Sequence, residues 1–173
     1  YMEDRFGLSV ADVTTGDYFV TEINTEEKLF DEIYKLMPSE IICNEAFFMS
    51  GMNIEDLKNR LGITIYSLDP WYFDDAICQD TLKEHFKVGS LTGLGLADYD
   101  CGIIASGALL IYLKETQKTS LSHMSRLIPY AAGKYMLLDS ATRRNLELCE
   151  TLREKQKRGS LLWVLDKTKT AMG

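Results

Sequence analysis

The sequence predicts an α/β domain followed by a shorter all-helical region. Short apolar runs alternate with segments of helical periodicity up to about residue 117, after an opening hairpin, and this alternation is typical of a sheet flanked by helices. Beyond residue 134 only helical segments follow. Hydrophobic residues make up 46% of the 173 residues, which is too many for a disordered chain. That length suffices for one domain and the beginning of another.

The opening segment predicts a β-hairpin. Phe6, Leu8 and Val10 alternate with small or polar residues, a period of two that indicates a strand. Residues 14–17 form the turn, because Gly16 tolerates a positive φ there. Residues 18–23 then return as the second strand.

Helices and short strands alternate after the hairpin. Asn24 and Glu27 have the spacing of a capping box, and Pro38 ends the helix that they begin. The remaining elements are a strand over 41–43, a helix from Asn53 to Leu61, a strand over 63–66, a helix over 74–86, a loop over 90–100 and a buried helix over 103–117. Small residues at 105–108 would let a neighbouring element approach this last helix closely.

A change of composition divides the chain. Residues 119–133 contain Pro129 and Gly133 and show weak periodicity, so we predict a linker between a domain over 1–118 and helices over 134–173. In the second part Asp139 is expected to cap a helix running to about Glu154. Ser160 is expected to cap a helix to Leu165, and Thr170 to cap a further one.

Charge is distributed unevenly along the chain. Residues 1–133 hold 10 basic and 21 acidic residues, a net charge of −11, whereas residues 134–173 hold 9 basic and 5 acidic residues, a net charge of +4. An acidic surface repels phosphate backbones, so the first part should not hold DNA by itself. We therefore expect its direct partners to be proteins.

Cysteine usage argues against a metal site. The four cysteines are widely spaced without a C-x-x-C pair, and only two histidines could assist them, so zinc is not expected. Four buried free thiols in a reducing cytosol are the expectation.

No apolar run approaches the ~18 residues that span a membrane. The first residue is Tyr1 and the last follows a helix-like run, so we expect both ends to lie inside a longer protein.

Four segments together resemble the MutS family of DNA mismatch repair proteins. Residues 138–148 match that family's L-D-x-A-T-x-x-N-L-E-L, and residues 160–173 match its S-L-x-x-V-L-D-x-T-x-T-x-M-G. Residues 113–123 resemble its Y-x-K-x-T-Q…L-x-H stretch, and residues 11–17 resemble its D-x-S-T-G-E hairpin. The resemblance covers nearly the whole chain in the right order.

The resemblance implies a connector domain with a ribonuclease H-like fold over 1–118 and the start of the helical core, or lever, domain over 134–173. The family's mismatch-reading domain and Walker ATPase would lie outside this chain, so we expect no enzymatic activity and no cofactor here. ATP and Mg²⁺ would belong to a bacterial, cytoplasmic and nucleoid-associated parent protein. The implied partners are MutL, the other domains, the second subunit of MutS and, through the whole protein, mismatched DNA; no membrane is expected.

The helix over 74–86 is the candidate MutL contact. Asp80, Thr81 and Glu84 are expected to be exposed there, with Ala76, Ile77 and Phe86 facing inward; a merely solvated face is an equal alternative. The neighbouring aromatic run over 71–73 predicts core packing of two of its members, with a partner-facing patch as the alternative.

In the second part, Arg143 and Arg144 are candidates for an interdomain contact, against solvation or pairing with Glu147. The basic run at Lys155, Lys157 and Arg158 is interpreted as a solvated loop, with DNA contact as the alternative. Trp163 is expected within the helical core.

Asp12 raises the alternative of a metal-dependent nuclease. An acidic residue on the first strand of a ribonuclease H-like nuclease binds Mg²⁺ together with other carboxylates, which here could be Glu45, Asp98 and Asp100. Asp12 also directly precedes a turn, where aspartate commonly accepts hydrogen bonds from nearby amides. The structural interpretation is the one we favour, with no catalytic or metal residue expected.

Overall fold

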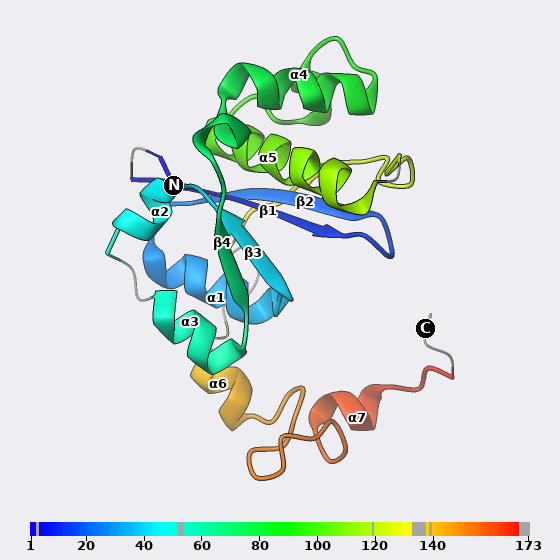
Figure 1. The fold of residues 1–173 in the computed structure, drawn as a ribbon. Coiled ribbons are helices and arrows are strands. Elements are labelled where there is room, and N and C mark those ends of the chain that lie inside the picture. The colour runs from blue at the N-terminus through cyan, green and yellow to red at the C-terminus, as the bar shows by residue number, and fades with distance from the viewer. Residues whose placement is uncertain (3, 52–53, 119, 133–137, 139, 170–173) are drawn as a thin grey trace. The chain divides into compact units, whose positions relative to one another are not determined.

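The computed structural model describes residues 1–173 apart from 3, 52–53, 119, 133–137, 139 and 170–173 (Figure 1). The chain forms two compact units, Tyr1–Lys134 and Tyr135–Gly173. Among the described residues, no helix is both long enough and apolar enough to cross a membrane.

The strands of the first unit form two small sheets. β1 (Phe6–Asp12) and β2 (Asp17–Ile23) are the predicted antiparallel hairpin, and β5 (Ile128–Pro129) pairs with β2 in parallel. β3 (Glu40–Cys43) and β4 (Thr64–Ser67) form a separate parallel pair. The α/β class is confirmed. A single ribonuclease H-like sheet is not, because no strand pairing joins the two sheets among the described residues.

Among the described residues of the first unit, five helices accompany these strands. They are α1 (Glu26–Leu36), α2 (Glu45–Met49), α3 (Ile54–Leu61), α4 (Asp75–Phe86) and α5 (Asp100–Gln117), with 3-10 turns η1 (Pro70–Phe73) and η2 (Leu91–Leu94) on either side of α4. α5 packs on β1, and α4 packs on the far side of α5 (Figure 1).

Two glycines allow this layering. A Cβ on Gly7 would lie 2.1 Å from the carbonyl oxygen of Cys101, so α5 rests directly on the β1 backbone. A Cβ on Gly107 would lie 2.3 Å from the Cβ of Cys78, so α4 and α5 also touch closely. The close approach predicted for residues 105–108 is confirmed.

Local capping differs from the prediction at the start of α1 and α2. Thr25, not Asn24, caps α1, because its Oγ1 accepts from the Lys28 amide at 3.4 Å. α2 was not predicted. Asn44 caps this helix by accepting from the Phe47 amide at 3.2 Å. The predicted cap Asn53 lies outside the described residues.

The described part of the segment predicted as a linker, residues 120–132, instead packs within the first unit. Leu121, Met124 and Leu127 are at most 4% exposed and lie in the same core as β2, α4 and α5. β5 extends the sheet, and the Tyr130 amide donates to the carbonyl of Val20 at 2.9 Å. These buried side chains belong to a segment of irregular backbone, so they do not recur at the spacing of a helix or a strand. For this reason the segment showed only weak periodicity in the sequence.

The second unit contains α6 (Ser140–Asn145) and α7 (Leu161–Leu165). The helix predicted to reach Glu154 ends at Asn145. Glu147 adopts a left-handed φ of 48°, and the Leu148 amide donates back to the carbonyl of Arg143 at 3.3 Å, which closes the helix end. Ser160 caps α7 as predicted, whereas Asp139 and Thr170 lie outside the described residues.

Candidate functional site

α4 has a buried inner stripe and an exposed acidic outer stripe. Cys78 and Leu82, one turn apart, are fully buried against α5 and the core. On the outer side the Asp80 side chain is 81% exposed and Glu84 is exposed, as expected, whereas Thr81 is half-buried and not exposed as predicted. Asp80 forms an ion pair with Lys83 at 3.5 Å. This helix can therefore offer carboxylates to a partner without disturbing its own packing.

The inward orientation predicted for Ala76 and Ile77 is wrong. Both are exposed, Ile77 by 42%, while Phe86 is half-buried against the core as expected. Successive helical residues are rotated by about 100°, so a stripe through Cys78 and Leu82 turns Ile77 to the side that carries Asp80 and Glu84. The four-residue spacing of the buried pair was the signal available in the sequence.

The aromatic run divides as predicted. Tyr72 and Phe73 pack against the core formed by Cys78, Ala108 and Ile111, whereas Trp71 remains 44% exposed. The Trp71 ring stacks on the Tyr72 ring with centroids 4.0 Å apart. Tyr72 donates its hydroxyl to Glu115, and this hydrogen bond raises the pKa of Tyr72 to about 12. Trp71 is thus presented at the surface on a fixed support.

Asp12 acts in the hairpin turn. Its Oδ1 accepts from the Thr14 amide at 2.8 Å, the Thr14 hydroxyl at 2.6 Å and the Thr15 amide at 3.3 Å. These bonds, led by the Thr14 hydroxyl, lower the pKa of Asp12. Within the described part of the chain, no three His, Cys, Asp or Glu side chains are grouped closely enough to hold a metal ion. The nuclease alternative therefore finds no support.

Three of the four thiols are buried. Cys43, Cys78 and Cys101 are buried and free, and burial raises the pKa of Cys43 to about 11 and that of Cys78 to about 12. Cys149 is exposed, contrary to the expectation of four buried thiols. Its position follows from the early end of α6, since the predicted helical stripe does not extend to it.

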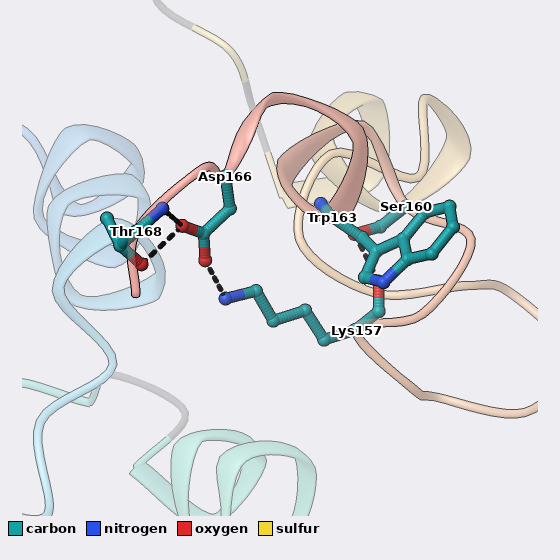
Figure 2. A network of polar contacts seen from close by, with 5 residues as sticks. All are labelled: Lys157, Ser160, Trp163, Asp166 and Thr168. Atoms are coloured by element: carbon teal, nitrogen blue, oxygen red, sulfur yellow. Dashed lines mark hydrogen bonds and ion pairs between the residues drawn. The ribbon is translucent and has the colours of Figure 1, made fainter. Parts of the chain in front are cut away.

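A polar network orders the basic loop of the second unit (Figure 2). Lys157 forms an ion pair with Asp166, which also accepts from the Thr168 amide at 3.0 Å and its hydroxyl at 2.6 Å. Ser160 accepts from the Trp163 amide at 3.2 Å and donates to the Lys157 carbonyl at 2.7 Å. The Lys157 bond lowers the pKa of Asp166. The Lys157 ammonium group is therefore engaged in an ion pair within the second unit.

The other second-unit candidates lie at its surface. Arg143 is half-buried and donates to the Cys149 sulfur at 3.8 Å, whereas Arg144 is exposed. Lys155 and Arg158 are exposed, as a solvated loop requires. Trp163 is 50% exposed on α7, so it is not buried in a core within the described residues. The interdomain role of Arg143 and Arg144 stays a prediction.

Comparisons with known proteins agree with the two-part organisation. The family model for MutS domain II matches residues 2–125, and the one for MutS domain III matches residues 141–173. The chain is 60% identical over its whole length to the DNA mismatch repair protein MutS of Lachnoclostridium phytofermentans, covering 19% of that protein. Over 97% of the chain it is 46% identical to MutS of Ruminiclostridium cellulolyticum, again covering 19%. The chain thus spans about a fifth of the length of these relatives. It belongs to the MutS family of DNA mismatch repair proteins.

Proposed function

We propose that the first unit is the connector of a mismatch repair protein, that the second unit begins its core, and that the connector docks MutL through the outer face of α4. The observation that carries the docking proposal is the division of α4 into a buried apolar stripe and an exposed acidic one. The chain itself would be non-catalytic. Binding of ATP, Mg²⁺ and mismatched DNA would belong to other domains of a cytoplasmic protein, and the second subunit would meet those domains.

A connector must hold its exit segment in a fixed position to transmit a change between domains. Tyr130, directly after β5, donates its hydroxyl to Glu32 at 3.2 Å, and Glu32 is only 3% exposed. Lys35 pairs with the same carboxylate at 3.2 Å and lies 5.7 Å from the centre of the Tyr130 ring. The Ala132 amide donates to the Thr21 hydroxyl at 3.4 Å. These contacts support a rigid exit from the sheet.

The ribonuclease H-like fold is part of the same proposal. β1 with β2 and β5 would form one portion of a mixed sheet, and the parallel pair β3–β4 the other. The helices α1, α4 and α5, which pack on these strands or on one another, are the flanking layers that such a fold needs.

Charge reversal on α4 tests the docking proposal. In the whole protein that contains this chain, Asp80→Arg together with Glu84→Arg should weaken ATP-dependent retention of MutL on end-blocked mismatched DNA, because like charges would meet at the interface. Thr81 is half-buried, so we leave it unchanged. Mismatch affinity and basal ATPase rate should be preserved.

The matched control is Glu55→Arg, which reverses an exposed carboxylate on α3 and should leave MutL retention unchanged. Wild-type retention in the α4 double variant would refute docking at this face. An equal loss in the Glu55→Arg variant would show that net charge, and not α4, controls retention.

A further inference from the structure

We propose that Trp71 and Ile77 form the apolar centre of the docking surface, and that the surface which covers them is a positively charged protein surface. This rests on the proposed function, since it places the centre of the MutL contact at the start of α4. The basis is an exposed indole stacked on Tyr72, an exposed isoleucine six residues later, and four aspartates with no cation over residues 66–82.

Both side chains are exposed although they are large and apolar. Trp71 is 44% exposed and Ile77 is 42% exposed. Single exposed apolar residues are ordinary, but tryptophan is the residue type most enriched among those that dominate binding energy. Ile77 follows η1 by one turn of α4 and shares the outer stripe with Asp80 and Glu84.

Trp71 is held before any partner binds. The Tyr72 amide donates to the carbonyl of Asp69 at 3.1 Å, and the Asp74 amide donates to the carbonyl of Trp71 at 3.3 Å, which closes the turn. Asp74 then caps α4 by accepting from the Ile77 amide at 3.0 Å. With its ring stacked on Tyr72, Trp71 loses little conformational entropy on association.

The charge near this pair in the sequence is predominantly negative, although Asp80 forms an ion pair with Lys83 at 3.5 Å. Residues 66–82 contain four aspartates and no Lys, Arg or His, and all four aspartates (Asp69, Asp74, Asp75 and Asp80) are exposed. Such a surface repels nucleic acid and attracts a protein surface with Arg or Lys side chains. A guanidinium could also lie over the Trp71 ring as a cation–π contact. Electrostatics therefore selects a basic protein partner over DNA.

The first test is truncation in the whole protein, with affinity for MutL measured by titration in the presence of ATP and mismatched DNA. Trp71→Ala should weaken binding roughly 30-fold or more, the range of dominant interface residues. Trp71→Phe should recover most of the affinity, because an aromatic ring remains. The control is Met49→Ala, which truncates a side chain 81% exposed on α2 and should change affinity less than about twofold.

The second test determines the sign of charge on the partner surface. It substitutes Ile77, which lies outside the turn that holds Trp71. Ile77→Lys and Ile77→Glu replace the same exposed side chain with long polar ones of opposite charge. Against a basic partner Ile77→Lys should weaken MutL binding more than Ile77→Glu, and the difference should grow as salt is lowered. The reverse order would overturn the basic-partner inference.

The outcomes separate the two proposals. If Asp80→Arg with Glu84→Arg weakens MutL binding while the Trp71 and Ile77 variants do not, docking at α4 stands and the apolar centre is refuted. If none of these variants alters MutL affinity, both proposals fail. If they change self-association or DNA affinity in place of MutL affinity, the occupant is a second copy or a nucleic acid, and the inference is overturned.

Discussion

Gly107→Ala should destabilise the first unit because the added methyl group would force α4 and α5 apart. The added methyl group would lie 2.3 Å from the Cβ and 2.5 Å from the Cα of Cys78, while carbon atoms in contact normally lie about 3.5–4.0 Å apart. The helices would have to separate by on the order of 1 Å. Because one of the opposing atoms is backbone, a side-chain rotation cannot relieve the contact.

Two opposing effects determine whether Gly107→Ala raises or lowers the free energy of unfolding. Alanine is favoured over glycine inside a helix by about 1 kcal/mol. Overpacking costs ~1–3 kcal/mol, and a backbone clash belongs at the upper end of that range. We therefore expect a net loss of about 2 kcal/mol in the free energy of unfolding.

This loss can be measured by unfolding the chain in urea and monitoring amide hydrogen exchange in α4 and α5. Exchange in these helices reports on the first unit separately from the second. Gly89→Ala is the control: nothing lies within 4 Å of its added Cβ, so stability should be unchanged or slightly raised. Wild-type stability of Gly107→Ala would refute the close approach of the two helices.

Three further outcomes follow from burial and hydrogen bonding. Leu110→Ala should cost ~2–5 kcal/mol in urea unfolding, because Leu110 is fully buried on α5, and a loss below 1 kcal/mol would contradict that core position. With a thiol reagent at pH 8 the native chain should show one fast thiol, and Cys149→Ser should abolish it, since the other three are buried. Asp12 has a pKa lowered in the folded state, so its contribution to stability is present above the unfolded pKa of about 4 and is lost as pH falls through the folded value. Asp12→Asn should therefore flatten the dependence of the urea midpoint on pH below about 4, and an unchanged dependence would exclude this role.

The sequence alone determined the features that depend on neighbours a few residues away. The hairpin follows from alternation and a glycine turn, and the cap at Ser160 is where the sequence places it. The charge contrast and the family motifs also needed no structure. The signals for the hairpin and for the Ser160 cap lie within a turn or a strand, so they depended little on long-range packing.

Only the tertiary structure decided which surfaces are covered. Leu121 and Met124 become core residues because β2, α4 and α5 surround them, although their own backbone is irregular. Ile77 faces outward because Cys78 and Leu82 fit against α5: the four-residue spacing of that pair allows such a stripe, and packing against α5 selects it. α6 ends at Asn145 because Glu147 adopts a left-handed φ and the Leu148 amide donates to the carbonyl of Arg143. Burial is set by contacts between residues distant in the sequence, and local patterns carry no information about which of those contacts will form.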